Sequence, residues 1–194
     1  MLAGMPLAEG VHADLLREAV ATEGRGHRAL LAGEPAKQAL EASAALYRAS
    51  WEAAPPASYG RLIGMLKAAV LAGDALEAAR YARAALGSSA TSAPASYALA
   101  IAALVEADDA SAADAAAGMR AGSPAMVRAA DAIAALAARD PAGYGEAIRS
   151  IVADFEGRDE HLTGVAIADT ALMLERLAAS RGMACGVESP LLPA

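Results

Sequence analysis

The stretch DPAGYGEAIRSIVADFE, residues 140–156, contains the main signals of an amphipathic helix. Asp140 is a favourable N-cap residue, and Pro141 suits the first helical position, where its missing N–H has no helical partner to lose. The apolar side chains that follow recur at helical spacing and lie on one face: Tyr144, Ala147, Ile148, Ile151, Val152 and Phe155. We therefore expect a helix over 141–156 that packs this face against other helices.

Comparable signals recur along the rest of the chain. Ser123-Pro124 repeats the pairing of an N-cap residue with a proline, and Gly73 stands where a helix would end. Asp74 and Glu77 have the spacing of a capping box. No alternation of β-branched residues indicates a strand. The sequence thus predicts an all-α protein of about nine helices, at 6–32, 35–53, 56–72, 74–86, 93–107, 111–121, 124–139, 141–156 and 160–181.

Short connections between these helices favour antiparallel packing of neighbours. The segment AGDALEAARYARAAL (72–86) resembles the second half of a tetratricopeptide repeat, and its small residues recur with a period near 34 as far as residue 147. We expect one all-helical domain over 1–194, built as an irregular, solenoid-like stack of helical hairpins with an extended C-terminal tail. The last helix is apolar over most of its circumference between Val165 and Ala178, which makes it our candidate for the core.

The 194-residue chain is acidic, with a formal net charge of −7 and a pI of about 5.0. This charge argues against a nucleic-acid-binding protein, which requires clustered Lys and Arg, and it suits a basic protein partner. Alanine supplies much of the apolar content and aromatic residues only 4%, so the core must depend on close packing of Leu, Ile, Val and Ala. The single cysteine, Cys185, excludes an internal disulfide.

Neither the N-terminal segment nor the longest uncharged stretch has the pattern of a membrane protein. Glu9 and Asp14 interrupt the N-terminal apolar run, so it does not have the pattern of a signal peptide. The longest uncharged stretch, 84–105, contains GSSATSAP, which is too polar for a membrane helix. We expect a cytoplasmic protein that does not bind membranes.

Groups that carry out chemistry are scattered along the chain. The histidines are His12, His27 and His161, and Glu23 stands four residues before His27 on one helical face. A zinc site needs three or four converging ligands, so we interpret the histidines as solvated surface residues. The segment GRGHRA (24–29) has the letters of a dinucleotide-binding motif without the preceding buried strand, and we interpret its glycines as a break in the first helix.

The acidic cluster Asp108, Asp109 and Asp114 lies at a turn and the start of a helix. It lacks the spacing of a calcium loop, and we interpret it as helix capping. No GxSxG, SxxK or P-loop motif occurs. We expect a protein that is not an enzyme, with no catalytic residues, bound metal or cofactor. An enzyme whose site is assembled from scattered carboxylates and histidines is the least favoured alternative.

Aromatic residues gather in one place. Tyr47 and Trp51 are four residues apart on one helical face, and Tyr59 follows beyond Pro55-Pro56. Large aromatic side chains are common both in cores and at the energetic centres of protein interfaces. The cluster is therefore either a local part of the core, which is the favoured interpretation, or an anchor for a protein partner.

The C-terminal third contains an ordered series of short motifs. Arg-Asp is followed by Gly-Tyr and an amphipathic helix, then a charged loop, an apolar helix, a glycine and a Val-Glu-Ser-Pro-Leu-Leu-Pro ending. This series resembles the C-terminal region of the immunity protein 49 family, all-helical proteins predicted to neutralise polymorphic toxins of bacteria. The matching residues are Arg139, Asp140, Gly143, Tyr144, Gly182, Glu188, Ser189, Leu192 and Pro193. Pro190 and Leu191 depart from the acidic and aromatic residues usual there.

The resemblance implies a non-catalytic protein that binds and neutralises a cognate toxin, and a basic toxin domain would suit the acidic chain. The alternative is a cytoplasmic helical-repeat adaptor with no link to a toxin. The tail itself has a structural interpretation: Gly182 ends the last helix, the prolines keep the chain extended, and Leu191 and Leu192 pack back over the helices. We expect the motif residues to form a structural clasp rather than a binding site.

Overall fold

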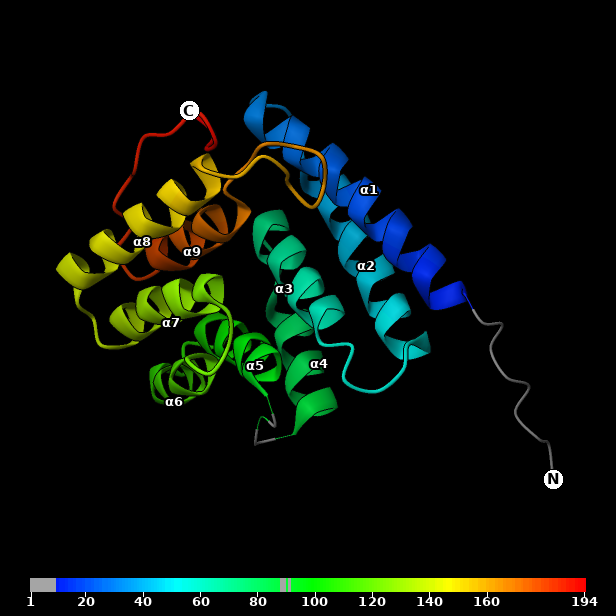
Figure 1. The fold of residues 1–194 in the computed structure, drawn as a ribbon, viewed down its shortest axis with the longest axis horizontal. Coiled ribbons are helices and arrows are strands. Elements are labelled where there is room, and N and C mark those ends of the chain that lie inside the picture. The colour runs from blue at the N-terminus through cyan, green and yellow to red at the C-terminus, as the bar shows by residue number, and fades with distance from the viewer. Residues whose placement is uncertain (1–9, 88–89, 91) are drawn as a thin grey trace.

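Nine α-helices and no strand make up the part of the chain that the computed structural model describes, residues 10–87, 90 and 92–194 (Figure 1). This confirms the predicted all-α class and the stack of helices. The helices are α1 (Val11–Leu31), α2 (Lys37–Ala53), α3 (Gly60–Ala72), α4 (Leu76–Leu86), α5 (Ala93–Val105), α6 (Asp109–Met119), α7 (Pro124–Ala137), α8 (Pro141–Glu156) and α9 (Asp169–Ala179). The predicted helix start at residues 6–9 lies outside the described residues.

Helix α8 forms over the residues that the sequence predicts. The Asp140 carboxylate accepts hydrogen bonds from the backbone N–H groups of Ala142 and Gly143, at 3.1 and 3.0 Å. Ser123 caps α7 in the same way, through the N–H of Met126. Tyr144 and Ile148, from the apolar face of α8, are completely buried. The local signals and the packing therefore agree in this part of the chain.

Helices that are neighbours in sequence pack on one another from α1 to α3 and from α4 to α8. Helix α3 connects these two groups, because it contacts α2 on one side and α5 and α9 on the other. In Figure 1, α1 and α2 form a long pair at one end, and α6, α7 and α8 stack at the other. The centre of the fold is α5, where the side chains from Tyr97 to Leu104 are buried with the exception of the half-buried Leu99. Helix α9 also contributes to the core, through Met173, Leu174 and Leu177.

Helix α1 continues through Gly24 and Gly26, so the predicted break is wrong. Both glycines are buried where another segment comes close. A Cβ atom on Gly26 would lie 2.7 Å from Leu40 Cδ2, and one on Gly24 would lie 2.9 Å from the Thr163 carbonyl oxygen. The two residues lack side chains because α2 and the loop after α8 pack directly against the backbone of α1.

Two other boundaries differ from the prediction. Helix α4 begins at Leu76 without a side-chain cap, so Asp74 and Glu77 do not form a capping box. The last helix begins at Asp169 rather than near residue 160. Residues 157–168 form an irregular segment that turns at Gly164, with φ of 67°, and buries Val165 and Ile167. This segment buries its apolar side chains against the rest of the protein without forming a helix.

The C-terminal tail packs back on the helices, as the sequence predicts. Gly182 adopts φ of 68° just after α9, and the N–H of Met183 returns to the carbonyl of Ala178 at 2.9 Å. Leu191 and Leu192 are half-buried against the core, and the Leu191 carbonyl accepts the N–H of Ala168 at 2.9 Å. The tail thus ties the irregular segment before α9 to the body of the protein.

Truncation after Gly182 is expected to lower the stability of the fold. It removes the apolar cover provided by Leu191 and Leu192 and leaves the N–H of Ala168 without its carbonyl partner. A net loss of about 2 kcal/mol corresponds to a fall of about 4–8 °C in Tm for a chain of this length. Differential scanning calorimetry of the truncated and full-length proteins measures the change. An unchanged Tm would show that the tail is not a clasp.

Candidate functional site

A groove runs between α2 and α4, over the middle of α3. Its volume is about 270 Å³. Small and apolar side chains form its floor, among them Ala44, Met65 and Ala69. Charged side chains stand along its rim: Glu41 and Arg48 on α2, Asp74 before α4, and Glu77 on α4. The groove therefore combines an apolar base with polar edges, as binding sites for polypeptide segments commonly do.

Arg48 fixes the rim of this groove. Its guanidinium donates to Glu52 at 3.1 Å and to Glu77 at 2.9 Å, and it lies 4.0 Å from the centre of the Tyr81 ring. The Tyr81 hydroxyl donates to the same Glu52 carboxylate at 3.0 Å. Arg48 thus joins α2 to α4 through two carboxylates and an aromatic face.

Negative charge predominates around the groove. Four carboxylates stand at or beside it, those of Glu41, Glu52, Asp74 and Glu77, against the two cations Arg48 and Lys37. The Glu77 side chain is 86% exposed although its Oε1 pairs with Arg48, so the carboxylate is accessible to a partner from solvent. An acidic rim of this kind attracts basic segments and orients them on approach.

The structure separates the predicted aromatic trio. Tyr47 is 2% exposed and belongs to the core, where its hydroxyl donates to Glu23 at 2.8 Å. Trp51 and Tyr59 are half-buried and stack with their ring centres 5.9 Å apart. Trp51 lies in the last turn of α2, one turn after Arg48, and Tyr59 lies at the start of α3. Trp51 and Tyr59 are thus the members of the trio that a partner could touch.

A buried polar cluster lies on the other side of α3. It contains Glu23 and His27 from α1, Lys67 from α3, and Asp169 at the start of α9. Glu23 and His27 are 2% and 1% exposed, so the interpretation of His27 as a surface residue is wrong. Lys67 forms an ion pair with Asp169 and donates to the Thr170 hydroxyl at 3.0 Å. His27 Nε2 lies 3.8 Å from Glu23 Oε1, and its Nδ1 lies 3.1 Å from Thr163 Oγ1.

Burial controls the ionisation of this cluster. It raises the pKa of Glu23 to about 7, although the charge of Lys67 acts in the opposite direction. It lowers the pKa of His27 to about 4, because the buried imidazolium would lose its hydration. Burial also opposes ionisation of Asp169, but Lys67 outweighs this effect and lowers the pKa of that carboxyl. His27 is therefore neutral at pH 7, whereas the Lys67–Asp169 pair is charged.

Glu23→Gln is expected to change the dependence of stability on pH. The folded pKa of Glu23, about 7, is above its ordinary value of 4.5, so its contribution to stability is complete below pH 4.5 and is lost as the pH rises through 7. His27 has the opposite effect, because its pKa falls from 6.5 to about 4 and its contribution is lost as the pH falls through that range. In the wild type, the effects of Glu23 and His27 on stability therefore have opposite dependence on pH wherever both groups titrate.

The variant retains only the His27 effect. Urea denaturation from pH 4 to 7 should show its stability rising with pH relative to that of the wild type, by at most about 1.4 kcal/mol per pH unit. His27→Gln should show the reverse trend, and Glu18→Gln, an exposed change on the same helix, should follow the wild type. Parallel curves for Glu23→Gln and the wild type would contradict the raised pKa of Glu23.

Two clefts reach the buried cluster. One, of about 300 Å³, is lined by His27, Lys67 and Asp169 together with basic residues of α7 and the loop after α8. The other, of about 270 Å³, is lined by Glu23, Tyr47, Lys67 and Asp169. Leu162, which is 79% exposed, borders both. Small solutes therefore have short routes from solvent to the cluster.

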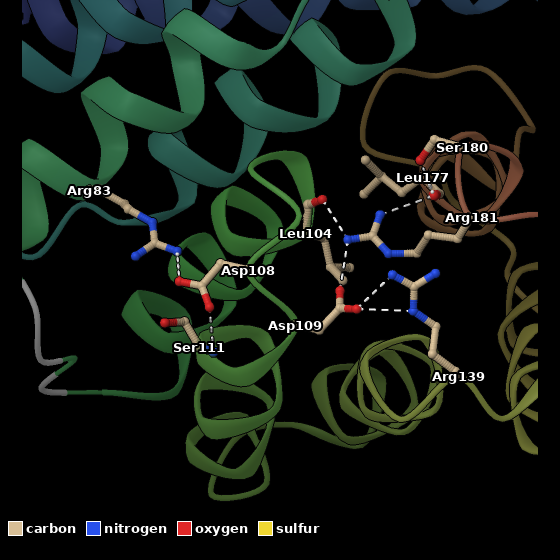
Figure 2. A network of polar contacts seen from close by, with 9 residues as sticks. All are labelled: Arg83, Leu104, Asp108, Asp109, Ser111, Arg139, Leu177, Ser180 and Arg181. Atoms are coloured by element: carbon tan, nitrogen blue, oxygen red, sulfur yellow. Dashed lines mark hydrogen bonds and ion pairs between the residues drawn. The ribbon is translucent and has the colours of Figure 1, made fainter.

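The residues of the C-terminal motif make contacts within the fold. Arg139, at φ of 55°, and Arg181 both bind the carboxylate of Asp109 at the start of α6 (Figure 2). The Tyr144 hydroxyl donates to Glu175 at 2.8 Å, and Ser189 donates to Glu156 at 2.7 Å. Other motif positions lie at the surface or partly covered, namely Gly143, Gly182, Glu188, Leu192 and Pro193.

The acidic residues at the start of α6 have three different environments. Asp108 caps the helix through the N–H of Ser111 and binds Arg83, as Figure 2 shows, and hydrogen bonds from Ser111 lower its pKa to about 2. Asp109 joins Arg139 and Arg181, and Asp114 is exposed. Capping therefore explains Asp108 but not the other two.

Cys185 has little nucleophilic character. Partial burial and a hydrogen bond to Glu175, at 3.3 Å from its Sγ, raise the pKa of the thiol to about 11. The same carboxylate accepts the backbone N–H groups of Cys185 and Gly186, at 3.1 and 2.8 Å. Glu175 thus holds the start of the tail through the backbone, and the thiol is a minor part of that contact.

No protein family model matches the chain, and neither the curated proteins nor the solved structures give a match. Among the described residues, every helix is too short or too polar to cross a membrane.

Proposed function

We propose that the protein is a non-catalytic protein-binding module whose partner inserts a basic segment into the groove between α2 and α4. The observation that carries this proposal is the arrangement of Glu41, Asp74 and Glu77 around an apolar floor, with Glu52 beside them as a partner of Arg48. The floor offers apolar contact area, and the carboxylates supply attraction and register for Lys and Arg side chains. The stacked pair Trp51–Tyr59 lies at the C-terminal end of α2 and would add an aromatic anchor for the partner.

We propose further that the module is a bacterial immunity protein, acting in the cytoplasm, that neutralises a cognate toxin by direct binding. The support is the resemblance of the C-terminal third to the immunity protein 49 family, together with the net charge of −7. A basic toxin domain would be complementary to the acidic groove. In this proposal the motif residues from Arg139 to Pro193 maintain the fold, and the groove supplies the specificity.

The second candidate is a helical-repeat adaptor that binds a basic peptide of a protein unrelated to toxins. The stack of antiparallel helices with a groove across neighbouring hairpins favours it, because helical repeats bind extended segments on such surfaces. Both candidates use the same groove. They differ in the identity of the partner.

A retention experiment tests the groove. The tagged protein is used to isolate partners from a lysate of the native cells, and the retained partner is then titrated against the wild type and against Glu41→Lys/Glu77→Lys. Reversal of two exposed rim charges should lower the affinity by about tenfold or more, most strongly at low salt. Glu18→Lys/Glu160→Lys makes the same change of net charge at exposed positions away from the groove and should bind like the wild type.

Each outcome has a defined meaning. A stoichiometric partner with a toxin domain supports the immunity protein, and a stoichiometric partner without one supports the adaptor. Equal weakening by both double variants would show that net charge, not the groove, determines binding. Unchanged binding of Glu41→Lys/Glu77→Lys would contradict the groove as the interface.

A further inference from the structure

Two buried side chains, Glu23 and His27, converge beside α3 with the partly buried Asp169 from the other end of the chain. One oxygen of Glu23, one oxygen of Asp169 and a ring nitrogen of His27 all lie within 4.8 Å of one another. Ligand atoms around a zinc ion stand about 2.0–2.2 Å from the metal, which places them roughly 3.5 Å apart. The three groups would need to move inward by about 1 Å to reach that separation.

His27 gives the second, independent indication of a ligand. Its side chain is 1% exposed, and its Nε2 makes no hydrogen bond with any residue in the described part of the chain. A buried, unpaired ring nitrogen is costly unless another group satisfies it. The Nδ1 atom lies 3.1 Å from Thr163 Oγ1. When Nδ1–H donates to this oxygen, Nε2 carries a lone pair directed toward Glu23, 3.8 Å away.

Each of the three side chains is also held by an outer partner. The Tyr47 hydroxyl donates to Glu23 Oε2 at 2.8 Å, which leaves Oε1 facing His27. Thr163 holds His27, and Lys67 binds Asp169 Oδ2. Outer hydrogen bonds of this kind are a regular feature of metal sites in proteins, where they orient the ligands and set the imidazole tautomer.

Two glycines allow these outer partners to approach. A Cβ atom on Gly64 would lie 2.7 Å from the Tyr47 ring, and one on Gly24 would lie 2.9 Å from the carbonyl oxygen of Thr163. A larger residue at Gly64 would therefore collide with Tyr47, and a larger residue at Gly24 would collide with Thr163. The cluster and its surroundings fit together as one unit.

We propose that Glu23, His27 and Asp169 bind one divalent first-row transition metal ion, with Zn²⁺ as the ion of choice. One imidazole and two carboxylates suit Zn²⁺, Mn²⁺ or Fe²⁺, whereas Ca²⁺ and Mg²⁺ prefer sites made only of oxygen. Three protein ligands leave at least one coordination position for water or a small ligand, and the two clefts lead to it. This proposal differs from the expectation, drawn from the sequence, of a protein without bound metal.

The charges of the cluster suit a cation. Lys67 repels a cation, but the carboxylates of Glu23 and Asp169, when both are ionised, outnumber this single positive charge and leave the cluster with a net negative charge.

Zinc binding to the full-length protein tests the proposal. The protein is treated with EDTA, transferred to metal-free buffer, and titrated with ZnCl₂ by equilibrium dialysis and calorimetry. We expect one ion per chain.

Tyr47→Phe, which removes an outer partner, should lower the affinity by roughly 10–100-fold, and His27→Gln should lower it further. His12→Gln and His161→Gln remove the other two histidines and should bind zinc like the wild type, with far-UV circular dichroism confirming the fold of each variant.

A measurement on the wild type keeps the test independent of the folding of His27→Gln. Nuclear magnetic resonance of the histidine rings reports each nitrogen directly, and His12→Gln and His161→Gln assign the signals. One equivalent of Zn²⁺ should shift the Nε2 resonance of His27 and leave the other two rings in place. Substoichiometric binding, a shift confined to His12 or His161, or no shift would overturn the proposal.

Discussion

Lys67→Met is expected to destabilise the protein by about 3–5 kcal/mol, because it leaves buried carboxylates without their cation. The Lys67 and Asp169 side chains are only 13% and 16% exposed, so solvent screens the pair weakly. The substitution also removes the hydrogen bond to Thr170. Methionine fills most of the volume of the lysine stem, so the loss reflects charge rather than a cavity.

Chemical denaturation at pH 7 measures this change, and the other lysine of the chain provides a matched control. Lys37 pairs with Glu41 at the surface, where the two side chains are 65% and 49% exposed. Lys37→Met should therefore cost no more than about 1 kcal/mol. Adding Asp169→Asn to Lys67→Met should recover part of the lost stability, because the uncompensated charge is then removed. A Lys67→Met variant as stable as Lys37→Met would show that the ion pair is not important for folding.

Local signals in the sequence are sufficient to predict that the helices form. They are not sufficient to predict whether α1 continues through its glycines or where α9 begins. Asp140-Pro141 and Ser123-Pro124 predict helix starts that the structure confirms, because capping depends on a few adjacent residues. Gly24 and Gly26 mislead, because their role depends on segments far along the chain that pack against α1. The sequence predicts a helix from residue 160 and is wrong over 160–168 for the same reason, since contacts with the tail and α1 determine the conformation of these residues.

For the candidate sites too, the sequence predicts part of the arrangement and misses the part that depends on helix packing. The spacing of Glu23 and His27 correctly indicates a shared helical face, but their burial follows from the approach of Lys67 and Asp169 from other helices. Lys67 is the single charged residue between Leu62 and Ala72 of α3, and that was the available signal. The groove between α2 and α4 has no sequence motif, because its rim combines residues whose relation is set only by helix packing.

The second large effect is expected at Asp109, where one carboxylate joins three parts of the fold. Its oxygens accept from Arg139 at 2.8 Å and from Arg181 at 3.0 Å, and thus connect the start of α6 with the residue before the α8 cap and with the end of α9 (Figure 2). The Arg181 side chain is 4% exposed and also donates to the carbonyls of Leu104 and Leu177. Removal of Asp109 therefore leaves a buried guanidinium with carbonyl partners but no counter-charge.

Asp109→Ala should lower the free energy of unfolding by about 3 kcal/mol, near the lower end of the range for a broken buried pair because Asp109 itself is 25% exposed. Asp114→Ala removes an exposed carboxylate from the same helix and should change stability by less than about 0.5 kcal/mol. Asp109→Asn retains hydrogen-bond acceptance without the charge, so its stability should lie between those of the wild type and Asp109→Ala. Equal effects of Asp109→Ala and Asp114→Ala in chemical denaturation would mean that Arg181 is satisfied by the carbonyls alone, and that α6, α8 and α9 are held together by their apolar contacts.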